Sequence, residues 1–166
     1  MEGRSLALVR HAKSSWADAE LADRDRPLSP RGRRAAAAVG QHLRDVGVHP
    51  DLALCSPAIR ARQTLELLHL ARTTEILFEE ELYGASPGDL LARLHRIPNE
   101  MTSALLVGHN PAVEQLARQL VKVASALPEK FPTGAVADLR VRIRTWTELD
   151  FGICRLHEFV TPRKLG

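Results

Sequence analysis

Short runs of apolar residues recur along the chain, separated by longer stretches in which apolar and polar positions follow a helical period. The runs cover residues 6–9, 52–55, 76–78 and 104–107. The first, second and fourth are apolar throughout, which is typical of strands that are covered on both faces. We therefore predict four short strands, most of them fully buried.

The stretches between these runs carry the spacing of amphipathic helices. Apolar residues in 113–121 follow the i, i+3, i+4, i+7, i+8 pattern, and those in 90–97 do much the same. Four pairs indicate helix starts, because a capping side chain precedes a proline suited to the first helical position. These pairs are Ser29-Pro30, Ser56-Pro57, Ser86-Pro87 and Asn110-Pro111.

Strands that alternate with helices predict an α/β fold in which helices cover both faces of a mostly parallel sheet. This is a three-layer α/β/α sandwich. Near the C-terminus, apolar residues alternate with polar ones from Ala137 to Ile143, which indicates an antiparallel or edge strand. The length of 166 residues suits one domain that spans 1–166.

Composition narrows the function classes. The net charge of +3 is small and the basic residues are mixed with acidic ones, which argues against nucleic acid as a partner. The apolar run 6–9 is too short for a signal sequence or a membrane span. The two cysteines, Cys55 and Cys154, form no CxxC pair, so we expect reduced thiols in a cytoplasmic protein without a membrane partner.

Basic and imidazole side chains follow three of the predicted strands. Arg10 and His11 follow the first strand. Arg60 lies in the first turn of the helix after the second strand, and His109 and Asn110 follow the fourth strand. In open α/β sheets, ligands bind beyond the carboxyl ends of the strands. We therefore expect these side chains to meet at one edge of the sheet.

Such a group suits phosphoryl transfer. Fixed positive charges stabilise a transferring phosphoryl group, and arginine matches its oxygens two at a time. A histidine attacks phosphorus through one ring nitrogen when a hydrogen bond holds the other. No cluster of acidic metal ligands accompanies these residues in the sequence, so we expect no metal.

The residues around His11 also resemble a known family. The string LVRHAKSSW at 8–16 is similar to the signature of the histidine phosphatase superfamily, branch 1, and most of all to its SixA-like phosphohistidine phosphatases. Three more segments agree in order and spacing: RPLSPRG at 26–32, SPAIRARQT at 56–64 and VGHNP at 107–111. The resemblance implies a phosphoglycerate mutase-like fold.

The resemblance also implies roles for single residues. His11 would be phosphorylated, Arg10 and Arg60 would hold the phosphate, and His109 would stabilise the transition state. Asn110 and Ser15 are further candidates for substrate contact. Two positions depart from the family pattern: Ala12 stands where a glycine is usual, and Glu81 occupies the place of the general acid without a decisive match.

We therefore expect a metal-independent phosphatase that works through a phosphohistidine intermediate. The resemblance to SixA-like proteins implies a histidine-phosphorylated protein as the first-choice substrate, and it also implies that no organic cofactor is needed. An imidazole leaving group brings its own proton, so a missing general acid would favour P–N over P–O substrates. Two alternatives stay open: a phosphomonoesterase for a small metabolite or a phosphoserine-type ester, and an inactive module that binds phosphate or phosphopeptides. The sequence leaves the physiological substrate and the oligomeric state undecided.

Overall fold

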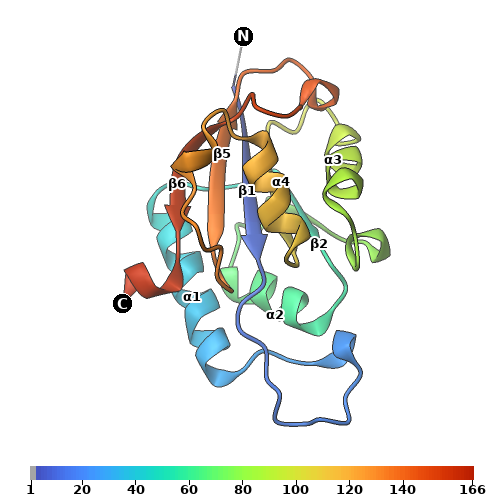
Figure 1. Cartoon of the computed structure of the whole chain (residues 1–166), viewed down its shortest axis with the longest axis vertical. Coiled ribbons are helices and arrows are strands. Elements are labelled where there is room, and N and C mark those ends of the chain that lie inside the picture. Colours follow the sequence, from blue (N-terminus) through green and yellow to red (C-terminus); the bar gives the residue numbers. More distant parts are fainter. Residues whose placement is uncertain (1–2) are drawn as a thin grey trace.

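A six-stranded sheet runs through the protein, and the computed structural model describes residues 3–166 (Figure 1). The strand order is β3-β2-β4-β1-β5-β6. All four predicted strands are confirmed within β1 to β4. The strands are β1 (Arg4–Arg10), β2 (Leu52–Cys55), β3 (Glu75–Phe78), β4 (Ser103–Gly108), β5 (Val136–Val141) and β6 (Arg155–Val160).

Four α-helices cover the sheet, and short 3-10 turns join them to the strands. The helices are α1 (Pro30–Asp45), α2 (Ile59–Leu68), α3 (Pro87–His95) and α4 (Ala112–Leu120). The 3-10 turns are η1 (Asp23–Asp25), η2 (Glu80–Leu82), η3 (Ala124–Ala126), η4 (Trp146–Glu148) and η5 (Pro162–Leu165). None of the helices in residues 3–166 has the length and apolar character needed to cross a bilayer.

The apolar strands are explained by cores on both faces of the sheet. In β1, Leu6 and Leu8 join the core beneath α3 and α4, whereas Ala7 and Val9 join the core beneath α1 and α2. Figure 1 shows α4 crossing one face of the sheet. The three-layer α/β/α arrangement is therefore confirmed, and both cysteines are buried as free thiols.

The sheet is parallel from β3 to β1, and β5 then pairs antiparallel with β1. This confirms the antiparallel strand predicted near the C-terminus. It is not the edge of the sheet, however, because β6 pairs with its outer side. The edge strand β6 was missed because its residues, RLHEFV, are mostly exposed or half-buried and lack a clean alternation.

Two of the four predicted helix starts are confirmed, and at the other two the proline precedes the helix instead of opening it. Ser29 and Ser86 accept hydrogen bonds from the first turns of α1 and α3. Helix α2 instead begins at Ile59, two residues after Pro57, and α4 begins after Pro111. The two irregular starts follow β2 and β4, at the sheet edge where the candidate site lies.

Helices α1 and α2 approach closely at Gly40. A Cβ at this position would lie 2.5 Å from the Cα and the carbonyl oxygen of Leu68, which is buried in α2. Backbone atoms cannot rotate away as a side chain does. The close contact between the two helices therefore requires glycine, which has no side chain, at position 40.

We predict that Gly40→Ala destabilises the protein, although alanine in a helix interior normally gains about 1 kcal/mol over glycine. Overpacking against the Leu68 backbone should lower the free energy of unfolding by about 2 kcal/mol. Urea denaturation monitored by circular dichroism measures the change. The exposed Ala38→Gly in the same helix is the control and should lose only about 1 kcal/mol; a more stable Gly40→Ala protein would contradict the prediction.

Candidate active site

His11 lies directly beyond the carboxyl end of β1, and its side chain is only 8% exposed. Its Nδ1 is 2.7 Å from the carbonyl oxygen of Ala12. A carbonyl only accepts, so Nδ1 carries the ring proton and donates it there. The lone pair is therefore on Nε2, as an attacking nitrogen requires.

Contacts from two elements, β4 and α2, hold the segment around His11. The His11 N–H donates to the Gly108 carbonyl at the end of β4, at 3.1 Å. The Ala12 N–H donates to Thr64 Oγ1 in α2 at 2.9 Å, and that hydroxyl donates to the Arg60 carbonyl at 2.7 Å. Helix α2 therefore positions both the segment after His11 and the first-turn arginine.

Alanine at position 12 fits without strain. Within residues 3–166, His69 is the one non-glycine residue with a positive φ, so Ala12 adopts an ordinary backbone conformation. Its side chain is fully buried and packs with Leu28 and Ala36. The departure from the family glycine is therefore accommodated by packing, since the backbone makes no demand that only glycine meets.

His109 follows β4 and its ring lies beside that of His11, with the ring centroids 5.2 Å apart. Its Nε2 is 2.7 Å from Ser56 Oγ, which also accepts a hydrogen bond from the Ala58 N–H. The hydroxyl after β2 thus orients the imidazole after β4. Tyr83 lies on another side of the ring, with a centroid distance of 5.6 Å.

Arg10 and Asn110 are held by one backbone carbonyl. The Arg10 guanidinium donates to the Phe131 oxygen at 3.0 Å, and Asn110 Nδ2 donates to the same oxygen at 3.2 Å. The Asn110 carboxamide oxygen accepts from the Glu114 N–H in α4. Glu114 lies in the first turn of α4, so the Asn110 side chain binds a first-turn N–H as a capping residue does, although Pro111 precedes the helix instead of starting it.

Arg60 is buried and is bound to an acidic residue that sequence reasoning missed. Its guanidinium donates to the Asp23 carbonyl oxygen at 2.7 Å and to Asp23 Oδ2 at 3.0 Å. Asp23 also accepts from Tyr83 at 2.5 Å and from Arg26 at 3.0 Å. The mixed charges of residues 23–26 resemble a solvated surface, and only their proximity to the RPLSPRG segment could have drawn attention to Asp23.

The pKa values show that these groups share one electrostatic field. Burial, with added repulsion from His109, Arg60 and Arg10, lowers the pKa of His11 to about 3. Burial and the same two arginines lower the pKa of His109 to about 4. The Tyr83 hydroxyl and Arg60 lower the pKa of Asp23 to about 2. Near neutral pH the site therefore holds two neutral imidazoles, two guanidinium groups and one carboxylate.

Glu81 lies away from this group. Its carboxylate is 2.5 Å from the Arg96 guanidinium and 3.7 Å from that of Arg93. The adjacent acids are also paired, Glu79 with Arg93 and Glu80 with Arg24. The structure thus brings Arg10, His11, Arg60 and His109 together and places Glu81 against α3 instead.

The remaining candidate, Ser15, belongs to the segment that leads from His11 to α1. Its hydroxyl accepts from the Ala17 N–H at 3.1 Å. Next to it, Trp16 is 74% exposed and lies over the Arg26 guanidinium, whose carbon is 3.3 Å from the ring centroid. The structure therefore places the Ser15 hydroxyl in a local turn, next to a Trp16 side chain that faces solvent.

A cavity of about 320 Å³ opens beside His109. Its other walls come from Asn110 and the start of α4, and from the segment between η2 and α3. Most of the side chains that line it are apolar or small. Within residues 3–166, no three histidine, cysteine, aspartate or glutamate side chains are grouped to hold a metal ion. That the reaction needs no metal stays a prediction.

Comparisons with known proteins show the family to which the chain belongs. Residues 6–97 match the model of the histidine phosphatase superfamily, branch 1. An uncharacterized protein of Mycobacterium tuberculosis is 41% identical over 93% of this chain and 100% of its own length. The phosphohistidine phosphatase SixA of Escherichia coli is 31% identical over 80% of this chain and 82% of its own length.

Solved structures of SixA proteins are similar over nearly the whole fold. One described as a SixA phosphohistidine phosphatase from Nakamurella multipartitia has a TM-score of 0.89 at 31% identity and covers 98% of both chains. A SixA protein histidine phosphatase complexed with tungstate has a TM-score of 0.78 at 27% identity, over 98% of this chain and 99% of its own. The chain therefore belongs to branch 1 of the histidine phosphatase superfamily and resembles its SixA members.

Proposed function

We propose that the protein is a phosphatase that dephosphorylates phosphohistidine in a protein, through a phosphorylated His11. The observation that carries the proposal is the state of His11. Its ring is neutral, its Nδ1 proton is held by the Ala12 carbonyl, and it lies in the field of Arg10 and Arg60. A neutral imidazole with an oriented lone pair beside fixed positive charge is prepared to attack phosphorus.

The reaction proceeds in two steps. The His11 Nε2 lone pair forms a bond to phosphorus while the bond between phosphorus and the leaving nitrogen breaks. Water then attacks the phosphohistidine, releasing phosphate and restoring His11. Arg10 and Arg60 bind the phosphoryl oxygens, and the hydrogen bond from Arg60 to the Asp23 carboxylate breaks. His109 exchanges its hydrogen bond with Ser56 for one to a phosphoryl oxygen.

The carboxylates around the site favour a nitrogen leaving group. Asp23 has a pKa of about 2 and is ionised near neutral pH, so it holds no proton to give. Glu79, Glu80 and Glu81 are all paired with arginines. An alkoxide leaves with difficulty without an acid, whereas an imidazole protonated on its other nitrogen leaves as a neutral ring.

Exposed apolar side chains at the same end of the sheet favour a protein substrate. Trp16 and Leu21 are exposed in the segment between His11 and η1, at 74% and 38%. Phe78, the last residue of β3, is 44% exposed. Aromatic and apolar side chains around a site supply contact area for a macromolecule that a small phosphate ester does not need.

We expect His11→Ala to lose hydrolysis by at least about a thousandfold, because the covalent path is removed. Wild type and variant are compared with phosphoramidate, p-nitrophenyl phosphate and a histidine-phosphorylated protein, all with EDTA present. Wild type should hydrolyse the two P–N substrates at least tenfold faster than the ester. Mass spectrometry of samples that are quenched without acid should find the phosphate on His11.

The exposed His157→Ala serves as the control and should keep full activity. Equal rates for wild type and His11→Ala would remove the nucleophile. An ester that is hydrolysed faster than both P–N substrates would leave the nucleophile in place and replace the phosphohistidine assignment by a phosphomonoesterase.

We predict that Glu81→Gln leaves the rate of p-nitrophenyl phosphate hydrolysis within twofold of wild type, since its carboxylate is bound to Arg96. The neighbouring Glu80→Gln, which removes the pair with Arg24, is the matched control. Steady-state kcat measured for both variants checks this. A fall of tenfold or more for Glu81→Gln alone would restore it as the general acid.

The lowered pKa of His11 predicts a stability that depends on pH. Between about pH 3 and 6.5 the unfolded chain binds a proton at this ring and the folded chain does not, so stability falls as the pH drops below 6.5. Replacing the ring by His11→Asn removes this penalty. From pH 7 to pH 5, wild type should therefore lose roughly 1–2 kcal/mol more unfolding free energy than the variant.

Urea denaturation at both pH values measures the difference. The exposed His157→Asn should follow wild type at both. If His11→Asn and wild type lose the same amount between pH 7 and pH 5, the folded ring titrates like an exposed histidine and the neutral nucleophile is wrong.

A further inference from the structure

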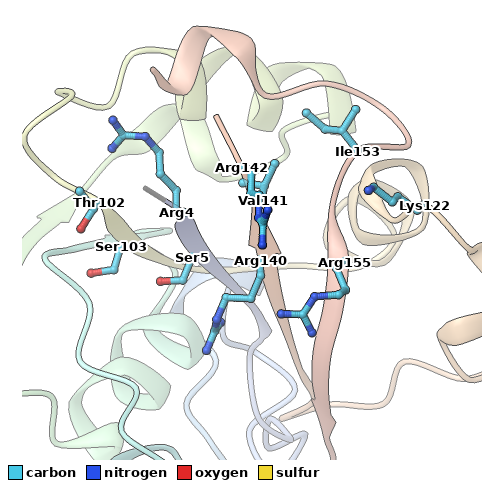
Figure 2. A pocket seen from close by; sticks show the side chains of 11 residues that line it. Arg4, Ser5, Thr102, Ser103, Lys122, Arg140, Val141, Arg142, Ile153 and Arg155 are labelled. Atoms are coloured by element: carbon cyan, nitrogen blue, oxygen red, sulfur yellow. The ribbon is translucent and has the colours of Figure 1, made fainter. Parts of the chain in front are cut away.

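A second cavity lies at the opposite end of the sheet from His11. It is a groove of about 1100 Å³ that is open to solvent (Figure 2). The starts of β1, β4 and β6 and the end of β5 form its floor. The catalytic candidates follow the other ends of β1 and β4, so the two sites share no residue.

Polar side chains form a row across four neighbouring strands in this groove. Ser103 in β4 pairs in register with Ser5 in β1, Ser5 pairs with Arg140 in β5, and Arg140 pairs with Arg155 in β6. Residues paired in register point to the same face of a sheet. Figure 2 shows the Arg155 guanidinium turned toward the strand that carries Arg140.

The groove gathers positive charge that the described chain does not neutralise. Five basic residues line it and no acidic residue does. Arg4 is bound to backbone carbonyls and Arg140 to the buried Asp138. The others are exposed and have no carboxylate partner within residues 3–166: Lys122, Arg142 and Arg155.

This arrangement has a cost in the absence of a ligand. Like charges placed directly opposite each other on neighbouring strands destabilise a sheet, and Arg155 faces Arg140 in this way; the bond from Arg140 to Asp138 reduces this repulsion without pairing Arg155. An anion between the two guanidinium groups converts that repulsion into two charge-assisted hydrogen-bonded contacts. The seryl hydroxyls of Ser5 and Ser103 extend the row of donors along the same line.

We propose that this groove is a binding site for an oligophosphate, a ligand with several linked phosphate groups. Arginine forks match phosphate oxygens two at a time, and hydroxyls donate to the same oxygens. Three exposed cations in one groove favour a ligand that carries several negative charges close together. A chain of phosphates supplies them at a higher charge density than a carboxylate peptide, and the groove is much larger than a single phosphate needs.

The test is titration calorimetry of the full chain with inorganic tripolyphosphate, and in a second arm with a nucleoside triphosphate, which separates the two sources of linked phosphates. Arg142→Ser/Arg155→Ser should weaken binding at least tenfold. Both residues are exposed, and Arg140 is kept because it pairs with buried Asp138. Phosphoramidate hydrolysis by this variant should equal that of wild type.

Two further variants decide where the ligand binds. Arg33→Ser/Arg34→Ser removes the same charge from the exposed face of α1 and should leave binding within twofold. Arg60→Ala disables the catalytic anion site and should also retain binding in the groove. Equal weakening by the α1 variant, loss of binding in Arg60→Ala, or binding of single-stranded RNA without binding of tripolyphosphate would each overturn the proposal.

Discussion

The candidate active site depends on one constraint. Two guanidinium groups must stay partly or fully buried beside two imidazoles, in a space shaped for an anion. Buried charge is costly unless it is paired and hydrogen-bonded. The protein meets this constraint by holding Arg10 on the Phe131 carbonyl and Arg60 on Asp23, and by keeping both imidazoles neutral. A phosphoryl group then replaces contacts that already exist, so little reorganisation separates the resting site from the occupied one.

The RPLSPRG segment supports the backbone next to His11. Ser29 caps α1, and its N–H donates to the Lys13 carbonyl. A Cβ at Gly32 would lie 2.0 Å from that same carbonyl oxygen, so only glycine lets the first turn of α1 approach the backbone two residues after His11. Arg26 donates to Asp23, which also holds Arg60. The Arg60 carbonyl in turn accepts from Thr64, whose hydroxyl binds the backbone after His11. The motif therefore marks the scaffold that fixes the imidazole.

Much of the fold could be predicted because buried strands and amphipathic helices leave local signals. The run 6–9 and the capped helix start at Ser29 are such cases. The edge strand β6 could not be, since a half-exposed strand has no core-facing period to detect. At the site, the strand ends predicted which side chains converge, but Asp23 is recognised only through contacts with Arg60 and Tyr83 that are distant in sequence. Ser56 departs from the regular cap because its side chain holds His109, whereas Asn110 binds a first-turn N–H of α4 from one position further away, with Pro111 outside the helix.

The chemistry of the leaving group follows from where the acids are. Each carboxylate near the site already accepts from an arginine, and pairing with a positive charge favours the ionised form over the proton-donating one. To supply an acid, one of these arginine–carboxylate pairs would have to break. Its carboxylate would then have to gain a proton beside positive charges, which favour the ionised form. A substrate that carries its own proton avoids both costs. Under the proposed function, the same positive field that would bind phosphate disfavours a general acid and so favours P–N bonds by chemistry instead of by shape.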